Sequence, residues 1–295
     1  MAWHLTSELE TFDTHAGAFV NDDPAQNTIF VTITAMLRRR GLRAFGSRPP
    51  RFGWYEGADG QVEAVFVRTP PHPIRMSAAS PQAAEELAQL LASTADGELG
   101  PDDLSGVGAP VGAAEAFSAR WCELTGASAS IHMRQRLFRL GELVVPSPAP
   151  AGRARVAGAA DRDLLLAWYR AFAAEVGEHH ADFERIVDDR IEYGGLTLWE
   201  ADGAPVSLAG ATRVIQGTSR VAPVYTPKES RGRGFGGAAT AAVSQAALDA
   251  GAREVLLFTD LANPTSNALY QRLGYRPIGD LMVHHFTDPH SSPAR

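Results

Sequence analysis

The sequence predicts a mixed α/β fold of two similar halves, each with a central mixed, mostly antiparallel sheet flanked by helices. The second half reads in the order helix, helix, three strands, helix, strand, helix, strand, from hydrophobic periodicity and turn residues. The first half repeats this order more faintly, and the turns at Asp59 and Asp202 occupy matching places in the two halves. A repeated plan on this scale predicts a duplicated domain.

In the first half, apolar residues spaced three or four apart predict helices, and short alternating runs predict strands. Helices are expected at 5–19 and 24–40, from Pro81 to about Leu91, and from about Val111. Strands are expected at 52–56, 62–68, near 72–77 and at 129–140, and residues 105–110 are expected to form a loop.

In the second half the same criteria give clearer elements. Helices are expected at 161–177, over a second amphipathic stretch from Phe183 to Ile191, from the glycine-rich turn to about Ala250, and within 266–275. Strands are expected on either side of Asp202 and Gly203, at 220–226, at 254–260 and near 280–286.

The joint between the halves is predicted in VVPSPAPAGR, where three prolines oppose helix continuation and sheet pairing. The predicted domains are therefore 1–143 and 155–295, with a Pro-rich linker at 144–154. The chain of 295 residues is long enough for two such domains.

Composition narrows the function classes. A formal net charge of -7 argues against general binding to nucleic acid or to an anionic membrane surface. The N-terminal residues lack a signal peptide and no long apolar run is present, so we expect a cytoplasmic protein. Cys122 is the single cysteine, which excludes an internal disulfide and a thiolate zinc cluster, and we expect no metal site, the adjacent His179 and His180 included.

The most informative stretch is YTPKESRGRGFGGAATAA, residues 225–242, where a strand is followed by a glycine-rich turn and a helix. Unpaired amides at a helix N-terminus bind phosphate oxygens when no side chain blocks them. Arg231 and Arg233 add cations that suit phosphate geometry. The turn therefore predicts a pyrophosphate site. The matching stretch of the first half, SAASPQAAEEL, has no glycine and carries Glu85 and Glu86, which predicts no such site there.

Two nucleotide motifs compete for this turn. The triphosphate-binding loop needs Gly-Lys-Ser/Thr, and here Gly236 is followed by Gly237 and Ala238. The dinucleotide pattern G-x-G-x-x-G is present, with Asp260 near the expected place of a ribose-binding acid. However, Pro227 and its neighbours separate the strand from the turn, and too little chain follows for such a domain. A dinucleotide-binding oxidoreductase remains a less favoured alternative.

The stretch Arg231-x-x-Gly234-x-Gly236 resembles the pyrophosphate motif of the GNAT superfamily of acyl-coenzyme A transferases. The loop and helix in NPTSNALYQRLGYRP resemble a second signature of that family, in the right order. The resemblance covers about residues 153–286, and the first half matches only in element order. It implies a tandem protein with a degenerate GNAT-like first half and a catalytic GNAT second half.

The resemblance also implies the cofactor, acetyl-coenzyme A, and the residues that bind it. The strand before the turn is expected to splay from its neighbour at a bulge and to hold the pantetheine arm, with a backbone N–H near Val224 facing the thioester carbonyl. The implied cofactor-binding residues are Val224, Tyr225, Thr226, Arg231, Gly232, Arg233, Gly234, Phe235, Gly236, Gly237, Asn263, Asn267 and Tyr270.

Catalytic roles follow from the same resemblance. Tyr270 matches the family's tyrosine that protonates the leaving thiolate, although a tyrosine on a short helix is more often core packing. The amine must lose a proton before it attacks, and Glu175 is the candidate base, with Glu178, His179 and His180 as residues of the acceptor pocket. A solvated helix end explains these four residues equally well.

The expected function is transfer of an acetyl group from acetyl-coenzyme A to a primary amine of a small molecule or peptide. The alternative from another class is a coenzyme A-binding sensor or scaffold without turnover. The acceptor, the acyl length and the oligomeric state, a homodimer among the options, stay open at this level.

Overall fold

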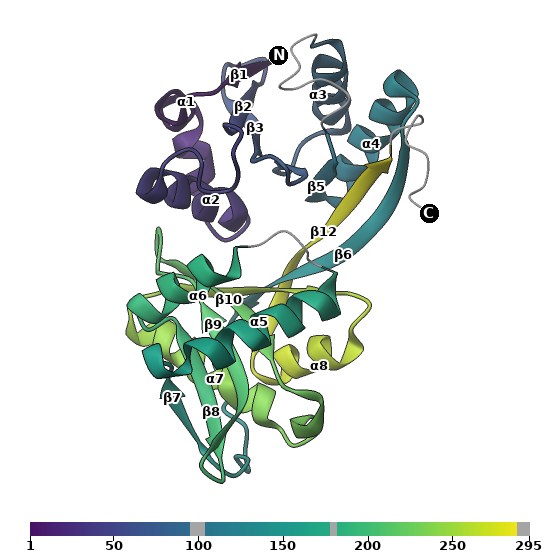
Figure 1. The fold of residues 1–295 in the computed structure, drawn as a ribbon. Coiled ribbons are helices and arrows are strands. Elements are labelled where there is room, and N and C mark those ends of the chain that lie inside the picture. The colour runs from purple at the N-terminus through teal and green to yellow at the C-terminus, as the bar shows by residue number, and fades with distance from the viewer. Residues whose placement is uncertain (95–103, 178–181, 288–295) are drawn as a thin grey trace. The chain divides into compact units, whose positions relative to one another are not determined.

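The computed structural model describes residues 1–94, 104–177 and 182–287. The chain folds into two compact units. Unit 1 comprises residues 1–136, 260–262 and 279–295, and unit 2 comprises 137–259 and 263–278. Both units mix helices and strands (Figure 1), which confirms the predicted fold class.

Unit 1 contains a mixed sheet in the order β1-β2-β3-β4-β5-β12, in which only the described β4–β5 pairing is parallel. Its strands are β1 (Ala2–Thr6), β2 (Arg51–Glu56), β3 (Val62–Arg68), β4 (Ile74–Met76), β5 (Gly106–Pro110), and most of β6 (Ser128–Leu140) and of β12 (Tyr275–Thr287). Its helices are α1 (Leu9–Asp22), α2 (Thr28–Arg40), α3 (Pro81–Ser93) and α4 (Val111–Thr125). Helices α3 and α4 pack on the sheet through a cluster that includes Leu87, Phe117 and Trp121.

Unit 2 contains a second run of strands in the order β11-β10-β9-β8-β7, in which only β10 and β11 are parallel. The strands are β7 (Arg153–Val156), β8 (Leu196–Ala201), β9 (Ala204–Ala211), β10 (Thr218–Tyr225) and β11 (Glu254–Asp260). The helices are α5 (Arg162–Val176), α6 (Phe183–Glu192), α7 (Phe235–Asp249) and α8 (Pro264–Arg272), and the first residues of β12 also belong to this unit.

The two faces of the unit 2 sheet carry different helices, because neighbouring residues of a strand point to opposite faces. Leu208 of β9 packs in a cluster with Leu165 of α5 and Val187 of α6. The next residue, Ala209, packs with Val243 of α7. Helices α5 and α6 therefore cover one face and α7 covers the other (Figure 1).

Three predicted elements were wrong. Residues 2–6 form β1, so the first helix begins at Leu9 and not at residue 5. Residues 105–110 were predicted to form a loop, but they contain β5, whose glycines obscure the strand pattern in the sequence. These glycines leave room for the His284 backbone beside Gly106 and for the Arg75 side chain beside Gly108. The predicted linker ends in β7, which pairs with β8.

Strands β6 and β12 each run from one unit into the other. The boundaries of the compact units therefore differ from those of the predicted domains 1–143 and 155–295. Residues 137–143 belong to unit 2, where Phe138 is fully buried, and residues 279–287 belong to unit 1, where Asp280 pairs with Arg136. The independence of the predicted domains stays a prediction.

None of the helices within residues 1–94, 104–177 and 182–287 is both long enough and apolar enough to cross a bilayer. No group of three or more His, Cys, Asp or Glu side chains in this part of the chain is placed to hold a metal ion.

Candidate functional site

Strand β10 separates from β11 before it reaches the glycine-rich turn. The parallel ladder between them ends at Val221, opposite Leu257, although β11 continues to Asp260. On its other edge β10 stays paired with β9, with a register shift between Val221 and Val224. The strands therefore open at a bulge, as expected from the sequence. Backbone groups of β10 beyond Val221 have no ladder partner on the β11 side.

The glycine-rich turn exposes an uncapped helix N-terminus. Gly232 and Gly234 have φ angles of 74° and 83°, the left-handed region that side chains rarely adopt. Gly234 is the N-cap of α7, so no side chain accepts from the first amides of that helix. The residues from Arg231 to Gly234 are exposed to solvent. The first turn of α7 thus offers free N–H groups and partial positive charge to an anion.

In α3, the helix of unit 1 that corresponds to α7, a side chain of the same segment accepts a hydrogen bond from an N-terminal amide. Ser80 is the N-cap of α3, and its Oγ accepts a hydrogen bond from the Ala83 amide at 3.1 Å. Pro81 fills the first helical position. The two halves therefore differ at this point: α3 is closed by its own side chain, whereas α7 remains open.

The two arginines of the turn are directed to other protein groups. Arg231 Nε donates to the Thr226 carbonyl at 2.9 Å, and its Nη2 donates to both carboxylate oxygens of Glu175 at 2.6 and 2.8 Å. The Arg233 guanidinium lies over the Phe235 ring, 4.7 Å from its centre. Arg231 thus joins the end of β10 to the end of α5, and the backbone amides are the groups left to meet an anion.

The predicted pantetheine strand is anchored on its β9 side. Val224 is paired with Ala209 and Tyr225 with Leu208. Burial raises the pKa of Tyr225, and the nearby Glu175 carboxylate adds to this effect. Thr226 Oγ1 lies 2.8 Å from Ser207 Oγ. These contacts fix one edge of β10 and leave the other edge open.

Tyr270 lies in the last turns of α8, in the same buried cluster as Leu273 and Tyr275. Its ring meets that of Tyr275 at 6.0 Å with an angle of 67°. Burial raises its pKa to about 12. The phenol therefore stays protonated at neutral pH, as a proton donor must. Its neighbour Leu269 lies against Gly237, where a Cβ would come within 3.0 Å of Leu269 Cδ1.

Asn263 and Asn267 organise the start of α8. The Asn263 side chain accepts from the Ser266 amide at 3.0 Å, which makes it the N-cap. Asn267 Nδ2 donates to the Asn263 carbonyl at 2.7 Å. Both side chains therefore have the structural role that asparagines most often take at a helix start.

Residues 162–275 match the model of the Acetyltransferase (GNAT) family. The second half of the chain is a GNAT-family domain. The matched range includes the open end of β10, the glycine-rich turn and α8, so the family assigned from the sequence is confirmed there. A search of curated proteins found no match.

Solved structures resemble the chain over nearly its full length. A GCN5-related N-acetyltransferase from Kribbella flavida is 23% identical, with a TM-score of 0.55 over 90% of this chain and 96% of that one. One from Sphaerobacter thermophilus is 18% identical, with a TM-score of 0.63 over 96% and 95%. A tandem GNAT protein from the clavulanic acid biosynthesis pathway is 15% identical, with a TM-score of 0.53 over 99% and 100%. At these identities the likeness concerns the fold, which is that of tandem GNAT proteins.

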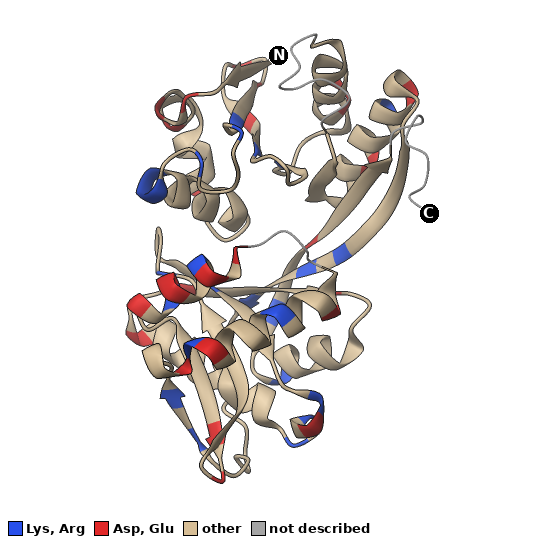
Figure 2. Cartoon of the chain, viewed as in Figure 1, with Lys and Arg blue, Asp and Glu red and all other residues tan. Residues whose placement is uncertain are grey.

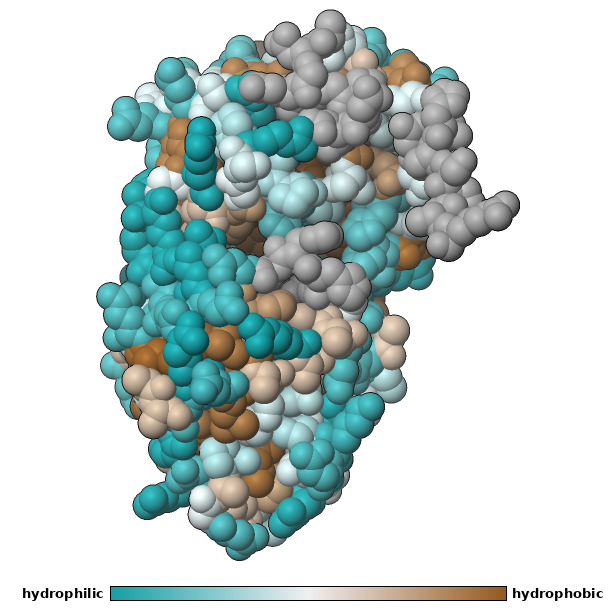
Figure 3. All heavy atoms as spheres, viewed as in Figure 1, coloured by the Kyte–Doolittle hydropathy of each residue, from teal (hydrophilic) through white to brown (hydrophobic). Residues whose placement is uncertain are grey.

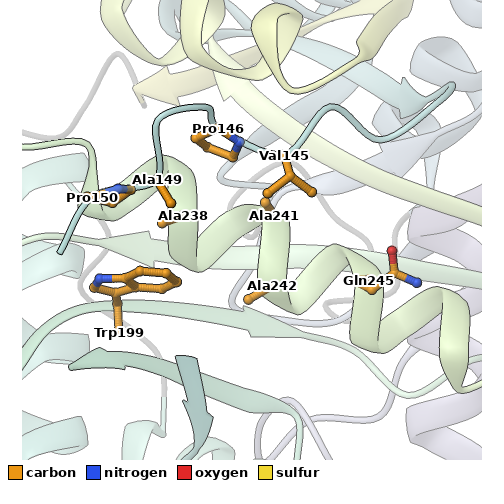
Figure 4. A pocket seen from close by; sticks show the side chains of 9 residues that line it. All are labelled: Val145, Pro146, Ala149, Pro150, Trp199, Ala238, Ala241, Ala242 and Gln245. Atoms are coloured by element: carbon orange, nitrogen blue, oxygen red, sulfur yellow. The ribbon is translucent and has the colours of Figure 1, made fainter. Parts of the chain in front are cut away.

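A small pocket lies beside the turn of the GNAT domain, between α7 and the Pro-rich segment (Figure 4). Its volume is about 140 Å³. It is lined by Val145, Pro146, Ala149, Pro150, Trp199, Ala238, Ala241, Ala242 and Gln245. No charged side chain lines it, so it is unsuited to phosphate. The Pro-rich segment also borders the turn itself, since Pro150 lies 3.7 Å from the place of a Cβ on Gly234.

The predicted acceptor residues are only partly placed. Glu178, His179 and His180 lie outside the described residues. Glu175 lies in the last turn of α5, beside Tyr225 and Arg231. Nothing in the sequence singled out Arg190 of α6, whose guanidinium donates to the Ala222 carbonyl at the β10 bulge. An arginine in an amphipathic helix gives no signal that distinguishes it from an ordinary surface residue.

Proposed function

We propose that the GNAT domain transfers an acetyl group from acetyl-coenzyme A to a primary amine. The observation that supports this most is the combination of an uncapped α7 N-terminus with a β10 edge that opens at Val221. The α7 N-terminus suits a pyrophosphate, and the open β10 edge suits an extended arm that forms hydrogen bonds along a strand.

Bound acetyl-coenzyme A supplies an activated thioester: the amine nitrogen bonds to the carbonyl carbon, the carbon–sulfur bond breaks, and coenzyme A leaves as a thiolate. In our proposal the amides of Gly232 to Gly237 hold the pyrophosphate. A backbone N–H near Val224 stabilises the negative charge that develops on the carbonyl oxygen. Both groups are backbone amides, so the fold positions them before any ligand arrives.

Tyr270 is our candidate for the acid that protonates the thiolate. A pKa of about 12 keeps its proton in place across the physiological range. The same burial that raises this pKa also holds the ring in one orientation against Tyr275.

Glu175 is our candidate for the base that accepts the amine proton. It sits at the Thr226 end of β10, two residues from Val224, which is about 7 Å along an extended strand. At that distance we propose transfer through an intervening water. Its ion pair with Arg231 fixes the carboxylate in this position.

Turnover with a broad panel of primary amines tests the function. Release of the coenzyme A thiol can be followed with a disulfide reagent, because Cys122 is the only cysteine and is half-buried. Thiol release that depends on an amine, with an acetylated product found by mass spectrometry, would support acetyl transfer. Tight acetyl-coenzyme A binding without turnover of any amine would instead support a sensor or scaffold.

A further inference from the structure

Helices α5 and α6 of the GNAT domain carry four arginines, and three of them are paired with carboxylates (Figure 2). The pairs are Arg162 with Asp188, Arg170 with Glu184, and Arg185 with Asp182. Arg190 is the exception: within residues 1–94, 104–177 and 182–287 no carboxylate lies at ion-pair distance from it. Its Nη1 donates a hydrogen bond to the Ala222 carbonyl, and its guanidinium also lies against the Tyr169 hydroxyl.

The Arg190 side chain lies at the open end of β10. Ala222 lies within the register shift of β10, directly after the last residue paired with β11. Arg190 also passes over Gly210 of β9, where a Cβ would collide with Nη1. The guanidinium therefore reaches the bulge from the α5 and α6 face of the sheet, about two strand residues from Val224.

A second donor, whose proton has no acceptor, lies next to Arg190. Tyr169 of α5 is 5% exposed, and its hydroxyl meets the Arg190 guanidinium, which can only donate, while no described residue accepts the hydroxyl proton. Burial raises the pKa of Tyr169, and the nearby Arg190 guanidinium opposes this rise. A buried hydroxyl without an acceptor is costly, and such a group in a native fold indicates a missing partner.

The Arg190 and Tyr169 side chains are both hydrogen-bond donors. A half-buried guanidinium with an uncompensated charge favours an anion, and its planar fork matches a carboxylate. The Tyr169 hydroxyl can donate to the same oxygen atoms. The visible face in Figure 3 carries hydrophilic and hydrophobic residues side by side over α5 and α6, with no broad apolar patch there.

We infer that Arg190 and Tyr169 bind a carboxylate of the acceptor, so that the amine acetylated by this domain belongs to a small molecule of the amino acid class. This rests on the proposed acetyl transfer. The carboxylate lies at the Ala222 side of the bulge and the amine at Val224, which limits the acceptor to a molecule whose two groups are a few bonds apart.

Matched acceptors test the inference. Each amino acid of a panel is compared with its own carboxamide, which has the same amine and lacks the negative charge. The amide's ammonium group loses its proton more readily, so amine basicity alone would favour the amide. We expect kcat/KM to be higher for the acid, and the acid-to-amide ratio to fall about 10- to 100-fold in Arg190→Met, the effect of losing a charged hydrogen-bond partner.

Three further variants distinguish a role in acceptor recognition from a role in folding. Tyr169→Phe keeps the buried ring and removes the hydroxyl, and we expect it to lower the same ratio several-fold. Arg162→Met removes an exposed, carboxylate-paired arginine of α5 and should leave the ratio unchanged. If Arg190→Met unfolds the domain, Arg190→Lys retains the charge without the fork and should lower the ratio less.

Other outcomes count against the inference. Equal losses for acid and amide in Arg190→Met would mean that Arg190 only braces the β10 bulge. Turnover of amides or simple amines without turnover of any amino acid would overturn the inference and leave acetyl transfer intact. Acetyl-coenzyme A binding with no turnover of any amine would contradict the proposed transfer itself.

Discussion

At the residue scale, Gly236 is the position where a side chain tests the pyrophosphate site most cleanly. Gly234 has a φ of 83°, so any substitution there also strains the backbone. A Cβ on Gly236 would meet Thr226 Oγ1 at 3.1 Å, a tight contact with a small side chain. We expect Gly236→Glu to weaken acetyl-coenzyme A binding about 30-fold or more, because it places a negative charge at the helix N-terminus. Titration calorimetry measures the affinity.

The matched control at this position is Gly236→Ala, which adds the Cβ without the charge. It should lose much less affinity than Gly236→Glu. Similar affinities of Gly236→Glu and the unmodified protein would show that no phosphate binds at this helix.

Tyr270 has a proposed chemical role and an observed packing role, and removal of one oxygen separates them. Tyr270→Phe keeps the ring against Tyr275 and Leu273. We expect kcat to fall about 100-fold or more with little change in acetyl-coenzyme A affinity, because only proton donation is lost. Steady-state kinetics and calorimetry on the same variant supply both numbers. Parallel losses of kcat and affinity would mean that the tyrosine only packs.

Burial of Tyr270 also predicts a pH dependence of stability. Its pKa is raised from 10.0 to about 12 in the folded protein. Above pH 10 the unfolded chain loses the proton while the folded protein keeps it, so the free energy of unfolding falls between pH 10 and 12. The fall amounts to about 3 kcal/mol from this group. Urea unfolding across this pH range should show a shallower fall in Tyr270→Phe, and identical slopes would contradict the burial of the hydroxyl.

At the element scale, the Glu175–Arg231 ion pair joins the end of α5 to the end of β10. The two side chains are 38% and 44% exposed, so the pair adds little stability, at most about 1 kcal/mol. If Glu175 is the base, Glu175→Gln should lower kcat about 100-fold while the melting temperature changes little. Thermal unfolding and the pH profile of kcat check both parts. An unchanged kcat would restrict Glu175 to the structural pair.

Local sequence signals explain which elements could be predicted. Helix α7 follows from the glycine turn and the alanine-rich stretch after it, and α8 follows from the Asn263 cap. Strands β1, β5 and β7 were missed because their short segments lack a clear strand pattern and depend on a partner strand for their stability. The same limit holds in the site. Backbone motifs identify the turn, whereas Arg231 pairs with Glu175 of α5 and Arg190 with the Ala222 carbonyl of β10, both distant in sequence.

At the scale of the whole molecule, unit 2 depends on residues that precede the Pro-rich segment. Phe138 is 0% exposed within the cluster that holds Tyr270 and Tyr275. The Gly141 and Val144 amides donate to the carbonyls of Gly274 and Leu273 at 3.1 and 3.0 Å. A fragment of residues 155–295 lacks Phe138 and the Gly141 and Val144 amides. The loss of Phe138 alone is worth about 3–5 kcal/mol, a large share of the stability of a domain.

We therefore expect a fragment of residues 137–295 to be much more stable than one of 155–295. Circular dichroism during thermal unfolding compares the two, and the full-length chain is the reference. A cooperative transition of the shorter fragment at the temperature of the longer one would show that the predicted domain 155–295 is independent.

We propose that the GNAT domain binds acetyl-coenzyme A through the open N-terminus of α7. Titration calorimetry of the full-length protein with acetyl-coenzyme A tests it most directly, with NADH as the control dinucleotide. We expect micromolar binding of acetyl-coenzyme A, no binding of NADH, and loss of the acetyl-coenzyme A signal in Gly236→Glu. Binding of NADH alone, or of neither ligand, would contradict the claim.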